Sequence, residues 1–214
     1  MSETSRSRLV APLAVVTVLA ALVAGLGGFF VGRNSVAPPA ESSADVGFVR
    51  DMYEHHGQAV EMSLIFREKT QNTTLRAIAY DIATSQGNQM GQMEGILKVW
   101  GYPMTRTGAP MAWMSGEDAQ GGHTHSSGGH VQPNGMMAGM ASAEQLQQLR
   151  GASGVAAEKL FLQLMITHHK AGIEMAKAGS ELADTDYVKT LATKMHAGQT
   201  AETALLESEL AKLG

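Results

Sequence analysis

Apolar side chains follow two different patterns along the chain. Residues 9–32 form one uncharged run, whereas from residue 45 onward apolar positions recur every three or four residues. In residues 74–100 the recurring positions are Leu75, Ala79, Ile82, Gln86, Met93, Leu97 and Trp100. This spacing places them on one face of an amphipathic helix. The periodic pattern predicts long helices over residues 45–70, 74–100, 155–182 and 186–213.

Short polar breaks group these helices into two hairpins, 45–100 and 155–213. Gln71-Asn72-Thr73 separates the first pair of helices, and Asp184-Thr185-Asp186 separates the second. Asp45 is the predicted N-cap of the first helix. Ser142 and Gln145 form a predicted capping box that opens a short helix over residues 142–150. Two hairpins of long helices predict an all-α protein with an antiparallel four-helix bundle over residues 45–213.

The two hairpins are copies of one unit. FVRDMYEHHGQAVEM (48–62) and FLQLMITHHKAGIEM (161–175) share Phe, Met, both His, Glu and the last Met at an offset of 113 residues. The same offset continues without a gap and pairs Gln86 with Gln199 and Glu94 with Glu207. A repeat of this length indicates one structural unit used twice, with each copy covering the apolar face of the other.

The uncharged run at 9–32 predicts a transmembrane anchor. Its 24 residues would span about 36 Å as a helix, which is enough to cross a bilayer core of about 30 Å. Arg6 and Arg8 favour a cytoplasmic segment 1–8 and an extracytoplasmic helical domain. The alternative is secretion after signal cleavage, although the run is longer than a signal core and Pro38 follows the nearest cleavage motif.

The segments that flank this anchor carry two further predictions. Residues 33–44 are rich in Pro, Ala and Ser and predict a semi-extended linker. Ala24, Gly28 and Gly32 lie four residues apart inside the run, which makes them a candidate helix-pairing face for a homodimer.

The composition excludes several classes of partner and site. The formal net charge is −4 and no basic stripe is present, so nucleic acid is not an expected partner. The chain has no cysteine, which excludes disulfides, thiolate metal sites and a cysteine nucleophile. It has 14 methionines, which serve either as flexible core residues or as thioether ligands for soft metals.

The repeated motif predicts a metal site. On a helical wheel His55 and His56 flank Met52 on the core-facing stripe, and Met62 lies on the same side. The second copy repeats this arrangement with Met165, His168, His169 and Met175. Buried imidazoles need partners, so these histidines either bind a metal or hydrogen-bond across the helices. Imidazole and thioether donors without thiolate favour copper, especially Cu(I), or its analogue Ag(I).

A di-iron site is the less favoured reading. It requires Glu-x-x-His on two helices and two further glutamates, whereas Met52 and Met165 occupy the positions three before the first histidine of each pair. Glu61 and Glu174 repeat but fall on the opposite face of the helix.

Additional soft donors lie outside the two motifs. Met195 and Gln199 on the last predicted helix could complete the site, and His196 lies beside them. The connector 101–141 is rich in Gly, Pro, Ser, Met and His, and a connector of this length is usually functional or disordered. Its candidate ligands are His123, His125, His130, Met136, Met137 and Met140.

The paired motifs M52YEHHGQAVEM62 and M165ITHHKAGIEM175, with GMMAGMASAEQLQQLRGASG before the second, resemble domain-of-unknown-function family 305. The resemblance covers residues 45–213 and implies a ferritin-like bundle, usually exported or membrane-anchored in bacteria, with some members associated with copper or silver handling. It implies that the eight His and Met residues of the two motifs form the site. We therefore expect a non-enzymatic, membrane-tethered binder of soft metal ions in the cell envelope. The alternatives are a ferritin-like redox enzyme and a structural or interaction module without metal.

Overall fold

The computed structural model describes residues 37–115 and 131–214. The helices of this part are α2 (Ala44–Arg67), α3 (Thr73–Trp100), the short 3-10 helix η1 (Ala112–Ser115), α4 (Ala143–Gly151), α5 (Gly154–Leu182) and α6 (Asp186–Lys212). The described part is all-helical apart from an isolated bridge between Val131 and Met137. None of its helices is both long and apolar enough to cross a membrane. The predicted anchor at 9–32 lies outside the described residues.

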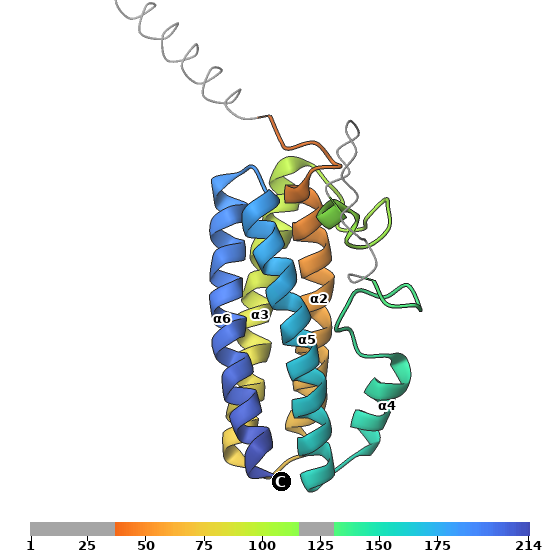
Figure 1. Cartoon of the computed structure of the whole chain (residues 1–214), viewed down its shortest axis with the longest axis vertical. Coiled ribbons are helices and arrows are strands. Elements are labelled where there is room, and N and C mark those ends of the chain that lie inside the picture. The colour runs from red at the N-terminus through yellow and green to blue at the C-terminus, as the bar shows by residue number, and fades with distance from the viewer. Residues whose placement is uncertain (1–36, 116–130) are drawn as a thin grey trace, which may run out of the picture. The chain divides into compact units, whose positions relative to one another are not determined.

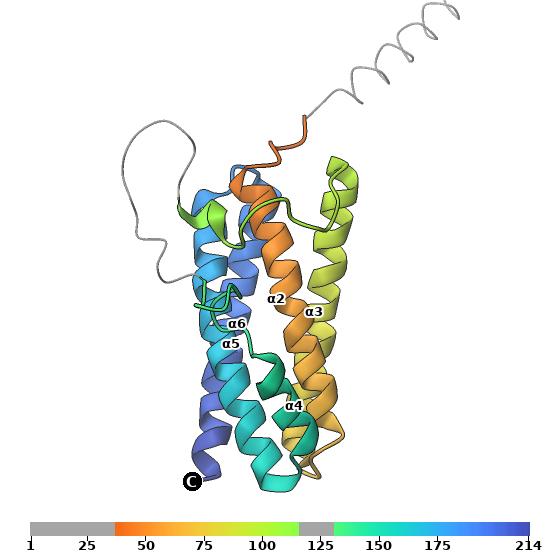
Figure 2. The same cartoon turned by 90° about the vertical axis from the view of Figure 1, so that its right-hand side faces the viewer.

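Two helical hairpins make up most of the described chain. α2 packs against α3 and α5 packs against α6, while α2 and α5 join the two hairpins. Figure 1 shows these four helices side by side. The shorter α4 lies against α2 and α5, as Figure 2 shows from the side. The observed helices begin and end within a few residues of the ranges that the apolar periodicity predicts.

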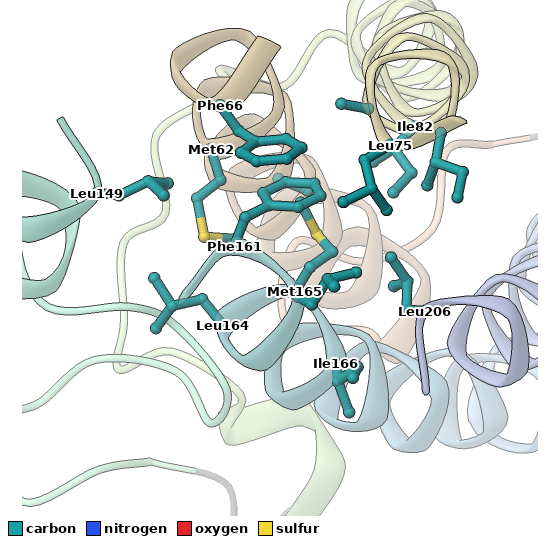
Figure 3. Close-up of a cluster of buried hydrophobic side chains, with 14 of the residues drawn as sticks. Met62, Phe66, Leu75, Ile82, Leu149, Phe161, Leu164, Met165, Ile166 and Leu206 are labelled. Atoms are coloured by element: carbon teal, nitrogen blue, oxygen red, sulfur yellow. The ribbon is translucent and has the colours of Figure 1, made fainter. Parts of the chain in front are cut away.

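Aromatic side chains fix the register between α2 and α5. The rings of Phe66 and Phe161 stack with their centroids 4.1 Å apart, and Figure 3 shows the two rings lying over one another. At the other end of the pair, Phe48 packs on Gly179, where an added Cβ would lie 2.4 Å from the ring. These contacts join the start of each helix to the end of the other, so α2 and α5 are antiparallel.

Buried apolar side chains form two clusters along these helices. The phenylalanine cluster (Figure 3) surrounds the Phe66–Phe161 stack and includes Met62, Leu75, Ile82, Leu149, Met165 and Leu206. The methionine cluster holds six buried methionines: Met52, Met93, Met111, Met137, Met175 and Met195. Between the two clusters, both α2 and α5 carry the paired histidines of the repeat.

The first helix is capped by a different residue from the predicted one. Ser43 is the N-cap of α2, and its side chain accepts a hydrogen bond from the Val46 amide. Asp45 lies in the first turn and its carboxylate accepts from the amides of Asp184 and Thr185 and from the Thr185 hydroxyl. The predicted Asp45 cap is therefore wrong, because this carboxylate caps the neighbouring α5–α6 turn instead.

Candidate metal centre

Four histidines form a continuous buried layer between the two clusters. His55, His56, His168 and His169 have no exposed surface. The imidazoles of His55 and His168 stack across the α2–α5 contact, with centroids 3.7 Å apart and planes inclined by 28°. The ring of His169 lies 6.2 Å from that of His168. The repeat thus brings its four histidines together, as the helical wheel predicts.

The outer histidine of each pair is held by the partner helix of its own hairpin. His56 Nε2 lies 2.6 Å from Gln89 Oε1, and His169 Nε2 lies 2.8 Å from Glu202 Oε2. A carboxylate or amide oxygen accepts, so Nε2 carries the hydrogen in both rings. In the neutral tautomer the lone pair then resides on Nδ1, and in both rings Nδ1 is buried without a partner. Such a hydrogen bond orients an imidazole for metal binding.

No hydrogen bond of normal geometry reaches either nitrogen of the inner histidines, His55 and His168, although the backbone at Ala138 and at His55 opposes the lowering of their pKa values. Together with the two Nδ1 atoms of His56 and His169, this leaves six unpartnered imidazole nitrogens in the layer. The side-chain amides of Gln86 and Gln199 are also buried and unpartnered, and Gln199 packs against Gly172 on α5. Buried polar groups are normally satisfied, since each unmade hydrogen bond costs about 1–3 kcal/mol. A polar guest would offset this cost.

Burial favours the neutral form of three layer histidines, His55, His56 and His168. The pKa of His55 is lowered to about 3, mainly by loss of hydration and then by the neighbouring His56 and His169. Loss of hydration also lowers the pKa of His56 to about 4, against the opposing effect of its hydrogen bond to Gln89. The pKa of His168 lies well below its ordinary value for the same reason, with repulsion from His55 next. Neutral imidazole is the form that ligates a metal.

The motif methionines do not share one position. All four are fully buried, but Met52 and Met175 belong to the methionine cluster while Met62 and Met165 belong to the phenylalanine cluster. The single site expected from the helical wheel is therefore a histidine layer with one pair of thioethers on each side. Of the additional candidates on α6, Met195 is buried in the methionine cluster and His196 is half-buried.

Part of the connector packs directly on the layer. Gln58 on α2 exchanges two hydrogen bonds with the backbone of Ala141, and Gly139, at φ +77°, lies against the backbone of Thr167 and His168. An added Cβ would clash there with the Thr167 carbonyl at 2.9 Å. Met137 is buried, and Met136 and Met140 are half-buried. The three connector histidines, His123, His125 and His130, lie outside the described residues.

The described residues contain no group of three or more His, Asp or Glu side chains arranged as a preformed metal site. The layer offers instead pairs of histidine nitrogens, with methionine thioethers on both sides of them along α2 and α5. Gln89 and Glu202 were not predicted from the sequence to be histidine partners. The signal was available, because these two residues are themselves related by the 113-residue offset.

Comparison with known proteins assigns the family. The family model for the domain of unknown function DUF305 matches residues 45–210, while no curated protein matches the chain. A DUF305 protein from Streptomyces coelicolor is 39% identical with a TM-score of 0.71, covering 82% of this chain and 96% of its own. A DUF305 fragment from Deinococcus radiodurans is 28% identical with a TM-score of 0.63, covering 83% and 99%.

A more distant structure, CopM in the Cu(II)-bound form, is 19% identical with a TM-score of 0.59 and covers 80% of this chain and 98% of its own. At this identity the match shows a shared fold. The region that the DUF305 family model matches contains both copies of the His/Met motif and the four histidines of the layer. The chain belongs to the DUF305 family.

Proposed function

We propose that this protein is a non-enzymatic binder of soft metal ions, Cu(I) and its analogue Ag(I), for sequestration or tolerance outside the cytoplasm. Its helical domain is a ferritin-like four-helix bundle held at the membrane by residues 9–32. The observation that carries the proposal is the set of six unpartnered nitrogens on four fully buried histidines. Such a layer costs stability in the free protein, and a bound cation would offset part of this cost by accepting imidazole lone pairs.

The donor set determines which metal is proposed. Neutral imidazole is a borderline ligand and thioether is a soft one, and together they favour copper and silver over magnesium or calcium. Two buried methionines of the methionine cluster, Met52 and Met175, lie next to the histidine layer along α2 and α5. Because the chain has no cysteine, metal binding at a His/Met site would not depend on the redox state of any thiol.

The relatives support the same reading. CopM has a Cu(II)-bound form, and the Streptomyces coelicolor relative is described as a secreted protein. The first supports metal binding, and the second supports a function outside the cytoplasm, to which the uncharged run at 9–32 would direct this chain.

The test is a Cu(I) titration of the full-length protein under a competing chelator. We expect at least one site far tighter than millimolar that is lost in the variant His55→Ala/His168→Ala. The control is Ile82→Ala, which opens a cavity in the neighbouring phenylalanine cluster without removing a donor. Binding no tighter than millimolar, or equal binding by the histidine variant and the control, would refute the proposed function.

A further inference from the structure

The two halves of the histidine layer differ in one charge. The repeat places Gln89 on His56 and Glu202 on His169, with Nε2 to oxygen distances of 2.6 and 2.8 Å. Both partners accept a hydrogen bond from Nε2, and Gln and Glu have nearly the same size and shape. The internal symmetry is therefore kept in geometry and broken in charge, with the negative charge on the side of His168 and His169.

This charge matters because every other donor in the layer is neutral. A cation bound only by imidazole, amide and thioether groups would place an uncompensated positive charge in the core, which is unfavourable in a medium of low dielectric constant. Glu202 is the carboxylate that the structure records in contact with a layer histidine. Its side chain retains 30% of its exposure, so it borders the layer and remains partly hydrated.

The buried carboxylates elsewhere in the described residues are already occupied: Glu158 accepts from the Thr70 hydroxyl, and Glu209 is paired with Lys212. Asp45 accepts from the Asp184 and Thr185 amides. Asp51 is paired with Arg106 and accepts from the Met111 amide and the Trp113 indole. These groups do not offer a free charge to a guest in the layer, whereas Glu202 touches it directly.

We propose that Glu202 sets the valence, number and position of the metal: the core takes one monovalent soft cation, held on the His168/His169 side. One carboxylate compensates one positive charge. Its hydrogen bond from Nε2 also directs the lone pair of His169 Nδ1 toward the interior and strengthens that nitrogen as a donor. Glu202 is thus a positioning and charge-compensating residue rather than a ligand. This inference rests on the proposed function.

The experiment uses four full-length proteins: the natural chain, Glu202→Gln, Gln89→Glu, and the double variant Gln89→Glu/Glu202→Gln. Each is titrated with Ag(I) and with Zn(II) against a competing chelator. The core site is defined as the one absent from His168→Ala/His169→Ala. Glu202→Gln retains an oxygen that accepts from Nε2, so the fold and the hydrogen bond are kept while the charge is removed. The double variant moves the single charge to the other half of the layer.

For the natural chain we expect one core Ag(I) per molecule and much weaker Zn(II) binding. Glu202→Gln should weaken Ag(I) binding by about 10–100-fold, the range typical for substitution of a residue that is hydrogen-bonded to a metal-binding histidine. The double variant should recover most of that loss, and Gln89→Glu, with two carboxylates, should gain Zn(II) affinity or a second Ag(I).

Equal Ag(I) affinity in the natural chain and Glu202→Gln would overturn the inference while leaving the proposed function intact. A double variant no tighter than Glu202→Gln would overturn it as well, because a purely local role of Glu202 is not restored by moving the charge. Absence of any core site in the natural chain would instead overturn the proposed function, and the inference with it.

Discussion

Acidification should strongly destabilise the metal-free protein, because burial lowers the pKa values of His55, His56 and His168. In the unfolded chain an imidazole titrates near its ordinary pKa of 6.5, whereas the folded protein holds the pKa of His55 to about 3 and that of His56 to about 4. Between these values the unfolded state binds more protons, so the free energy of unfolding falls as the pH falls. This stability is fully present above 6.5 and is lost progressively below it.

The magnitude follows from proton linkage. Lowering the pH from about 7.5 to about 5 costs about 2 kcal/mol for each imidazole that titrates only in the unfolded chain. His55 and His56 together therefore remove about 4 kcal/mol, against a typical total stability of about 5–15 kcal/mol. His168 acts in the same direction, because its pKa is also lowered by burial.

Urea unfolding of the chelator-treated protein at the two pH values measures this loss. His55→Leu removes one titrating group, and we expect its loss to be smaller than that of the natural chain by about 2 kcal/mol. Ile82→Ala is the matched control, since it weakens the neighbouring cluster without changing any titrating group. Equal losses in His55→Leu and in the natural chain would show that His55 is hydrated in the folded protein, contrary to the structure.

Three further predictions concern the buried amides, the phenylalanine stack and the connector. Gln86→Met and Gln199→Met remove unpartnered amides and should each raise the stability of the metal-free protein by about 1 kcal/mol in urea unfolding; a loss would indicate that the amides are satisfied. Phe161→Ala should cost about 3–5 kcal/mol, whereas the exposed Leu64→Ala should stay within about 0.5 kcal/mol. Gly139→Ala should cost about 1–3 kcal/mol and increase proteolysis near the connector, and unchanged cleavage would contradict the packing seen there.

Much of the helical arrangement was predictable because the apolar period and the repeat act locally and twice. The stripe that contains His55 and His56 faces inward for the same reason that Met52 does, so their burial followed from helix geometry alone. The antiparallel contact of α2 with α5 then brings the second copy to the first. The repeat predicts this contact between the two copies, since each copy must cover the other's apolar face.

Other features depended on contacts that one helix does not encode. Ser43 and Asp45 are both acceptable N-caps, and the choice was decided by Thr185 from the other hairpin. Each motif already separates its two methionines by about 15 Å along the helix, but the register set by the Phe66–Phe161 stack decides which methionines of the two helices meet.

The packed end of the connector was hidden for a similar reason. Its composition resembles that of a loose segment, but Gln58 binds Ala141 and Gly139 allows a close approach to α5. A long-range side-chain to backbone contact of this kind leaves no periodic signal in the sequence. The consequence is practical: deleting the connector would also remove Met137 from the methionine cluster, so its methionines are better tested by substitution to leucine.

The central claim is that the buried histidines themselves bind the metal, and silver–nitrogen coupling measures this directly. In the full-length protein labelled with nitrogen-15 histidine and loaded with Ag(I), the account predicts scalar coupling from silver to Nδ1 of His169, with the proton retained on Nε2 toward Glu202. Coupling should also reach His168, and both should vanish in His168→Ala/His169→Ala. Silver coupled only to histidines of the connector, with the layer resonances unchanged, would contradict the account.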